Sequence, residues 1–465
     1  MFTTPQLTAE TDGRAWLRAM LAFERALAAA EAEVGVIPED AASEIARHCD
    51  PERFDAASIA ERAVSSATPV IPLVRDLTAL VDESAAPHVH KAATSQDVVD
   101  TAAMLVTRRA LDVVLADLRA AEQECRRLAE EHRHTLMIGR SLLQQALPTT
   151  FGRRCASWLT ALREATDGLE RVRRERLAVQ FGGPAGTLSA LDHHGTRVLG
   201  ELADELGLVE PVLPWHTDRT RIGELAGSLG TVSGALGKIA LDVKLHAQTE
   251  VGELAEGASG GSSAMPHKRN PVGAVLVTSA AQRVPALVGT LLSAMPQEHE
   301  RAAGAWQAEW EPLVELLRLV GSAASRTRSV LSGLEVHREA MAANLDLTGG
   351  LVMAESATRP LARALGRTAA HDLVTGLCRR ALERGTSLRA ELLDDEQVRR
   401  VLSEQDVLAA TDPSDYLGSS GEFIDRALAH ASPADARASG NAASDDRATS
   451  DSASSKPARD EGDHR

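Results

Sequence analysis

The feature that most restricts the fold of this chain is the segment from Asp97 to Glu131, which contains neither glycine nor proline. Apolar residues recur along it at roughly helical intervals, namely Ala102, Leu105, Val113, Val114, Leu118 and Ala121. Such a helix would be about three times the mean length for globular proteins, and its apolar side needs long partners. The segment therefore predicts a bundle of long helices.

Other segments agree with an all-α fold. Trp16 to Val34 has the spacing of an amphipathic helix that Gly35 and Pro38 would end. A second long helix is expected after Pro148, and a third from about Pro271 towards Leu331. Aromatic residues make up only 3% of the chain, which leans on helix-forming Ala, Leu, Arg and Glu.

A stripe of glycines marks the segment from Arg221 to Leu241. Five glycines follow one another at spacings of 4, 3, 4 and 3, which places them on one helix face: Gly223, Gly227, Gly230, Gly234 and Gly237. Each costs about 1 kcal/mol relative to alanine in a helix interior. One interpretation is a flexible, poorly formed helix. We favour the other, a helix that another backbone approaches closely in the core of an oligomer.

Composition excludes several classes of protein. A formal charge of −16 argues against a general nucleic-acid binder. The four cysteines are scattered without a CxxC pair, so we expect neither disulfides nor a zinc site. No apolar stretch reaches about 18 residues and no signal peptide is evident, which predicts a cytoplasmic protein without a membrane segment.

The chain divides into four expected parts. Residues 1–96 form an N-terminal helical domain, residues 97–344 a central long-helix bundle, and residues 345–431 a C-terminal helical domain. Residues 432–465 contain no Leu, Ile, Val, Phe, Met, Trp or Tyr. Because such a segment cannot bury enough apolar surface to offset its ordering entropy, we expect a disordered tail.

The segment with the most chemical information runs from Gly260 to Pro271 and reads GGSSAMPHKRNP. Glycines beside two serines predict a mobile loop, and His267, Lys268 and Arg269 concentrate positive charge in an acidic protein. Taken alone, this pattern fits a solvated basic loop as well as it fits an anion site.

Residues 262–271, SSAMPHKRNP, resemble the signature of the fumarase/aspartase superfamily. The resemblance covers roughly residues 10 to 430 and implies an all-helical enzyme without cofactor or metal. It implies that Ser263 is the catalytic acid or base and that Lys268 assists it. Met265, His267 and Asn270 carry over as residues that bind the substrate, while Ser262 has a structural role in ordering the loop.

Two further segments resemble the same superfamily, in the expected order. Residues 90–97, HKAATSQD, supply four candidate ligands for a substrate carboxylate, namely His90, Thr94, Ser95 and Gln96. Ala92 stands where the family usually has glycine, and Ser95 is also placed to cap the following helix. Residues 140–152, RSLLQQALPTTFG, supply Gln145, Thr149 and Thr150, the last two just before a helix whose free N–H groups suit an anion.

Within the superfamily, residues 214–219, 298–310 and 412–418 are similar to the bacterial 3-carboxy-cis,cis-muconate cycloisomerases of protocatechuate breakdown. His216 and Arg219 would then bind an additional substrate carboxylate, since Arg does so bidentately. A structural role for His216 is the alternative. The implied reaction is closure of 3-carboxy-cis,cis-muconate to 4-carboxymuconolactone.

Gln145 separates the alternatives. By its spacing from Thr149 it stands where adenylosuccinate lyases have a general-acid histidine. Expelling a nitrogen group needs a proton donor, whereas a carboxylate with a pKa near ~4 leaves without one. Gln145 thus favours a cycloisomerase, admits another dicarboxylate lyase with a good leaving group, such as a nitrosuccinate lyase, and disfavours adenylosuccinate. A non-catalytic relative would lack Ser263 or Lys268, and both are present.

The resemblance also implies the assembly. Members of the superfamily are homotetramers whose active sites combine segments of three chains around a central helical bundle. The residues near Thr94, Thr149 and Ser263 would then come from different subunits. Each active site would bind a small anionic carboxylate substrate.

Overall fold

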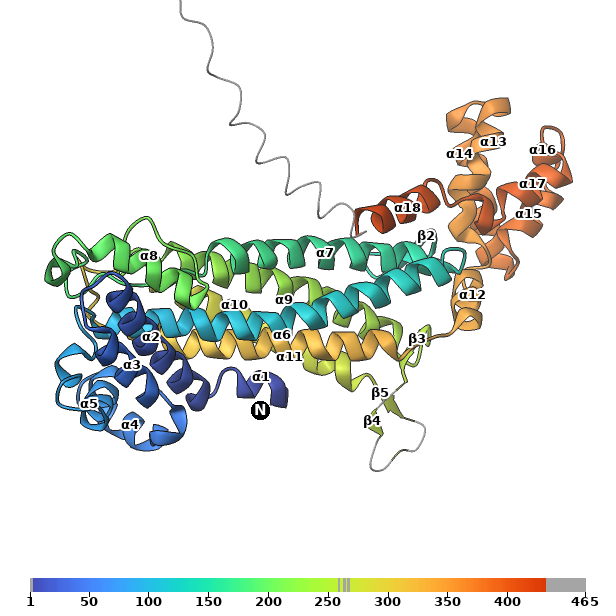
Figure 1. Cartoon of the computed structure of the whole chain (residues 1–465). Helices are drawn as coiled ribbons and strands as arrows, with labels where there is room; N and C mark the ends of the chain where they lie inside the picture. The colour runs from blue at the N-terminus through green and yellow to red at the C-terminus, as the bar shows by residue number, and fades with distance from the viewer. Residues whose placement is uncertain (1–2, 258–259, 262–264, 266–267, 432–465) are drawn as a thin grey trace, which may run out of the picture.

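The chain folds as a bundle of long helices. The computed structural model describes residues 3–257, 260–261, 265 and 268–431. Five long helices run along its length (Figure 1); they are α6 (Ser95–Glu131), α7 (Phe151–Glu175), α9 (Thr220–His246), α10 (Val272–Ser293) and α11 (Trp310–Ser332). The predicted all-α fold class is confirmed, and the expected tail, residues 432–465, lies outside the described residues.

Local sequence explains where α6 and α7 begin. Thr94 is the N-cap of α6, and its backbone N–H donates to the Asp97 carboxylate at 3.0 Å. Thr150 caps α7, because its hydroxyl accepts from the Arg153 N–H at 3.1 Å. The prediction that Ser95 caps α6 was wrong by one residue, since Ser95 is already the first helical residue.

One predicted helix is two. The segment from about Pro271 towards Leu331 folds as α10 and α11, which pack against each other after a connection that holds Pro296 and Gly304. Proline lacks the N–H that a helix interior needs, so Pro296 was a usable signal for the break. Folding back lets both helices cover α9.

The glycine stripe lies within α9, as predicted, but its glycines face two directions. A Cβ on Gly223, Gly230 or Gly237 would lie 2.7–3.3 Å from side chains of the same chain, all on or just after α10. Gly227 and Gly234 would meet no described atom within 4 Å. Three of the five glycines therefore allow close packing inside one chain, against side chains rather than a backbone, and the other two face open space.

Shorter helices cover the two ends of the bundle (Figure 1). The N-terminal helices are α1 (Pro5–Ala9), α2 (Gly13–Glu33), α3 (Glu39–His48), α4 (Ala56–Ala63) and α5 (Val70–Leu80), with α8 (Gly195–Leu206) packed on α2. At the other end lie α12 (Arg338–Asp346), α13 (Ala354–Leu365), α14 (Arg367–Arg384), α15 (Leu388–Asp394), α16 (Glu396–Arg399), α17 (Glu404–Ala410) and α18 (Ser420–His430).

The division into helical domains stays a prediction, and the apolar clusters refine it. Helices α13 to α17 share a core of their own. Helix α18, which falls inside the expected C-terminal domain, instead buries Ile424 and Ala427 in the main core and packs on α7.

By length and composition alone, α10 is apolar enough to cross a membrane. Within the single chain only 22% of its most apolar 18-residue window is buried.

Strands are few and form three antiparallel pairs. The strand β1 (Leu136–Ser141) pairs with β2 (Gln144–Thr150), and β3 (Leu254–Glu256) pairs with β6 (Leu334–Val336). The two-residue strands β4 (Gly260–Gly261) and β5 (Arg269–Asn270) form the base of a hairpin that projects from the bundle (Figure 1).

Candidate active site

The amino end of α6 is built around the buried carboxylate of Asp97. This carboxylate accepts hydrogen bonds from the backbone N–H groups of Gly182 and Gly183 at 3.1 and 3.0 Å, as well as from Thr94. It also contacts His216 Nε2 at 2.6 Å. Because Asp97 is 0% exposed, these contacts fix the loop before α6 to two distant parts of the chain.

Gln96 belongs to the same buried layer. Its side-chain amide donates to the His216 carbonyl at 2.8 Å and to Asp100 at 3.1 Å. The residue is 0% exposed, and among the described residues its Oε1 has no partner. Gln96 and His216 thus support the loop from its buried side, whereas Thr94 and Ser95 are partly exposed.

Arg219 does not fit its predicted role. Its three guanidinium nitrogens contact Asp100 and Glu309 at distances from 2.6 to 3.2 Å, and its guanidinium lies 4.9 Å from the centre of the Trp215 ring. Burial raises the pKa of Glu309, although Arg219 opposes the shift. Since Arg219 is 2% exposed and bound to two carboxylates, we correct the expectation that it binds a substrate carboxylate.

The carboxyl end of α6 leads into the β1–β2 hairpin, which carries Gln145 and Thr149. The Gln145 amide donates to the Asn344 carbonyl at 2.9 Å, and its Oε1 is buried without a described partner. Arg140, opposite Gln145 in the hairpin, donates to Glu253 at 2.7 and 3.1 Å.

Glu253 anchors this end. It is 0% exposed and also receives hydrogen bonds from His246 and from the Asn344 side chain. Burial opposes its ionisation, but the contacts with His246, Arg140 and Asn344 outweigh burial and lower the pKa of Glu253 to about 2. The hairpin that holds Gln145 is therefore tied to α9 and α12 by an ionised carboxylate.

Of the signature segment, the structure describes Met265 and residues 268–271, and Arg269 and Asn270 form β5. Lys268 is exposed, Met265 is 43% exposed, and Asn270 is half-buried beside the start of α10. The Lys268 N–H donates to the Met265 carbonyl at 3.1 Å. Ser263 and His267 lie outside the described residues, so their expected roles stay proposals.

The structure separates the predicted residues into two groups. His90, Thr94, Ser95, Gln96 and His216 lie at the amino end of α6, whereas Gln145, Thr149, Thr150, Lys268 and Asn270 lie near its carboxyl end (Figure 1). A helix of 37 residues is about 55 Å long. One chain therefore does not bring the two groups together.

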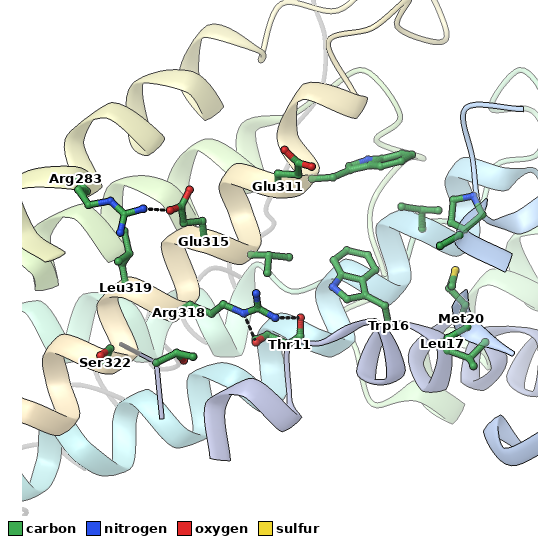
Figure 2. A pocket seen from close by; sticks show the side chains of 18 of the residues that line it. Thr11, Trp16, Leu17, Met20, Arg283, Glu311, Glu315, Arg318, Leu319 and Ser322 are labelled. Atoms are coloured by element: carbon green, nitrogen blue, oxygen red, sulfur yellow. Dashed lines mark hydrogen bonds and ion pairs between the residues drawn. The ribbon is translucent and has the colours of Figure 1, made fainter. Parts of the chain in front are cut away.

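Neither group lines the cavity shown in Figure 2. That cavity, about 1130 Å³, lies between α2, α10 and α11 and is mostly apolar. Arg318 donates to Thr11 across its floor, and Arg283 pairs with Glu315 at its rim (Figure 2). Thr149 instead lines a smaller cavity of about 610 Å³ together with Arg140, Arg153 and Lys238. Among the described residues, no cluster of His, Cys, Asp and Glu suits a metal ion.

Sequence reasoning missed the acidic partners of the predicted residues. Asp100 and Glu309 enclose Arg219, Glu253 supports the hairpin of Gln145, and Glu24 contacts His90 Nδ1 at 2.7 Å. One signal was available, because Glu24 lies among apolar residues of an otherwise amphipathic helix.

Comparison with known proteins agrees with this architecture. Residues 2–286 match the family model described as Lyase, and residues 350–427 match the one described as Adenylosuccinate lyase C-terminus. The chain is 45% identical to the 3-carboxy-cis,cis-muconate cycloisomerase of Pseudomonas aeruginosa over 434 residues, which cover 92% of this chain and 95% of that relative. It is 44% identical to the nitrosuccinate lyase of Streptomyces davaonensis, over 91% of this chain and 92% of the relative.

Solved structures give the same grouping. The 3-carboxy-cis,cis-muconate lactonizing enzyme of Pseudomonas putida matches with a TM-score of 0.89 at 42% identity, covering 92% of this chain and 97% of that one. A fumarate lyase of Mesorhizobium matches with a TM-score of 0.86 at 35% identity, covering 92% and 98%. The resemblance noted in the signature segment is thereby confirmed, and the chain belongs to the lyase family of the fumarase/aspartase superfamily.

Proposed function

We propose that this protein is a cycloisomerase that closes 3-carboxy-cis,cis-muconate to 4-carboxymuconolactone. The observation that carries the proposal is the 45% identity to a cycloisomerase over 92% of this chain. The substrate class, a small carboxylate, follows from the same family. The reaction moves no electrons to or from a partner and requires no cofactor.

The proposed chemistry passes through a stabilised carbanion. One carboxylate of the muconate adds to a carbon of the neighbouring double bond and forms the C–O bond of the lactone. The π electron pair moves towards the adjacent carboxylate, which becomes an enediolate. Lys268 and Asn270 stabilise that charge as preorganised donors, and Ser263 delivers a proton to the carbon.

The substrate carboxylates need further donors. We propose Thr94 and Ser95 at the amino end of α6, Thr149 and Thr150 at that of α7, and His90, Met265 and His267 around them. Free N–H groups at a helix amino end favour an anion, which supports both pairs of hydroxyl residues. Gln96 and His216 would support the loop from behind, because both are buried and bonded to it or to Asp97.

Gln145 favours a good leaving group. Its amide donates to a backbone carbonyl and has no acidic proton to give to a departing amine. A carboxylate, which leaves in the reverse direction of lactonisation, needs none. The same argument supports the second candidate, elimination of nitrite from nitrosuccinate, which the 44% identity to a nitrosuccinate lyase also favours.

A panel of three substrates tests the assignment. Purified protein is expected to lactonise 3-carboxy-cis,cis-muconate, followed by its ultraviolet absorbance, and to leave adenylosuccinate intact. Nitrite release from nitrosuccinate without lactonisation would replace the first candidate by the second. Cleavage of adenylosuccinate would contradict the argument from Gln145.

We also propose a homotetramer with shared active sites, working in the cytoplasm. Two observations support it: the predicted residues lie at opposite ends of a helix of about 55 Å, and α9 and α10 leave apolar or glycine surface uncovered in the single chain. Val275 of α10 is 49% exposed, and Gly227 and Gly234 of α9 face open space. A second chain on this surface would bury it and could complete each site.

Subunit exchange tests the shared site. Ser263→Ala should lower turnover by at least ~10²-fold, the usual contribution of one acid or base. A Thr149→Ala/Thr150→Ala double variant should also be inactive. Mixing the two after proven exchange should restore part of the activity, because some sites would then combine intact segments. An active monomer by light scattering, or no recovery despite exchange, would refute sharing.

A further inference from the structure

Helix α2 carries two buried carboxylates whose oxygens are not all hydrogen-bonded. Glu24 and Glu31 are seven residues apart, on one helix face, and are 1% and 0% exposed. Among the described residues, Glu31 has no hydrogen-bond partner for either oxygen, and Glu24 has one for Oε1 alone. Burying a carboxyl group that is not fully hydrogen-bonded destabilises a fold. We therefore looked for a function of Glu24 and Glu31 that would offset this cost.

The one partner of Glu24 is His90, in the loop before α6. Glu24 Oε1 lies 2.7 Å from His90 Nδ1. His90 and Ala92 both have a φ of +57°, a left-handed conformation that costs energy for residues with a Cβ. The contact therefore holds a strained loop, four residues before the Thr94 cap of α6.

The other nitrogen of His90 is available to a ligand. The His90 side chain is 17% exposed, and among the described residues no group forms a hydrogen bond with its Nε2. A carboxylate at Nδ1 keeps the proton on that nitrogen in the neutral ring and stabilises the charged ring. With the Arg219 guanidinium enclosed by Asp100 and Glu309, His90 Nε2 is a donor at the amino end of α6 that a substrate carboxylate could reach.

We propose that Glu24 is a positioning residue for substrate recognition, which orients His90 so that Nε2 donates a hydrogen bond to a carboxylate held at Thr94 and Ser95. This inference rests on the proposed function, since it assumes a substrate with several carboxylates. Glu24 does not touch the substrate; it acts through His90.

The charges around His90 set the sign of the pH dependence. Burial lowers the pKa of His90, but Glu24 through charge and hydrogen bond, and Asp97 through charge, outweigh burial and raise it. Lys91 and Glu31 are charged neighbours of this cluster, and burial, opposed by Lys91, raises the pKa of Glu31 to about 8. Cys49 and Arg25 also lie near Glu24, and burial, with the charge of Glu24, raises the pKa of the Cys49 thiol to about 12. The charged form of His90 is lost as the pH rises through its raised pKa, so carboxylate binding should weaken there. Removing the Glu24 charge should move that loss to lower pH.

Calorimetric binding of tricarballylate, an unreactive tricarboxylate, to the full-length assembled protein tests the inference between pH 6 and 9. Glu24→Gln keeps an oxygen that can accept from Nδ1 but removes the charge. We expect it to bind tricarballylate about tenfold more weakly at pH 7.5, the scale of one hydrogen bond to a charged group, and nearly normally at pH 6.

Glu31→Gln is the matched control. It lies on the same buried face and does not contact His90, and near pH 7 its carboxyl group is largely protonated, so an amide replaces it with little change. Up to about pH 7.5, where the Glu31 carboxyl group is still mostly protonated, its binding should follow that of the wild type. A loss equal to that of Glu24→Gln would show a general effect of the α2 face and overturn the inference.

His90→Gln keeps the test decisive if Glu24→Gln folds poorly. It should weaken tricarballylate binding to the same extent and remove the pH dependence, and the double variant should add no further loss. Additive losses, or binding by Glu24→Gln that equals wild type at every pH, would overturn the inference. Because tricarballylate binding needs no turnover, a wild type that binds it without lactonising carboxymuconate would refute the proposed function and leave this inference standing.

Discussion

The exposed site residues predicted from the sequence lie near the carboxyl end of α6, whereas its amino end carries a buried hydrogen-bonded network. At the amino end, Gln96, Asp97 and His216 are at most 4% exposed and form one hydrogen-bonded network with Arg219 behind it. At the carboxyl end, Lys268 and Met265 lie exposed on a short hairpin. The hydrogen bonds at the amino end are thus already formed in the chain without substrate. The donors at the carboxyl end are still exposed to solvent.

In the proposed reaction the two ends have different roles. A preorganised end orients carboxylates at little reorganisation cost, because its dipoles are fixed by buried partners. The Ser263 end has to admit the substrate and release the lactone, which favours exposed groups. Three variants test how sharply the two ends differ.

The largest effect is expected from Arg219→Met. The change leaves Asp100 and Glu309 buried without their cation, which should lower the free energy of unfolding by about 3–5 kcal/mol in urea at fixed protein concentration. Arg119→Met, which breaks an exposed pair with Glu170 between α6 and α7, is the control and should cost at most about 1 kcal/mol. Equal stability of the two variants would return Arg219 to the candidate ligands.

A smaller, pH-dependent effect is expected at the other end from Glu253→Gln. The pKa of Glu253 is about 2 in the folded chain, below its ordinary value of 4.5, so its contribution is complete above pH 4.5 and is lost as the pH falls towards 2. The variant should lose about 3 kcal/mol of unfolding free energy at neutral pH and match the wild type near pH 2.

Unfolding followed from pH 7 to pH 2 measures this difference. Glu164→Gln, an exposed position on α7, should track the wild type throughout. A Glu253→Gln penalty that stays constant down to pH 2 would mean that the carboxylate contributes packing, not charge, to the hairpin that holds Gln145.

The sequence predicted what is local and periodic. Helix α6 followed from apolar spacing and from the absence of glycine and proline, and the helical form of the glycine stripe in α9 followed from the spacing of its glycines. Motif residues were located by resemblance. The role of Arg219 was not predictable, because its partners Asp100 and Glu309 lie 119 and 90 positions away and nothing local identifies them. The α10–α11 break was missed although Pro296 marked it.

The smallest effect, and the one that best separates the two ends, is expected from Ala92→Gly. Ala92 has a φ of +57°, which costs an alanine about 1 kcal/mol relative to glycine, while glycine adds entropy to the unfolded chain. If the buried network forces this strain on the loop, Ala92→Gly should raise the unfolding free energy by up to about 1 kcal/mol. The neighbouring Ala93→Gly is the matched control: Ala93 does not have a positive φ, so it should lose about 0.5–1 kcal/mol. Opposite signs in urea unfolding would establish that the amino end of α6 holds its loop against strain, and destabilisation of both variants would contradict it.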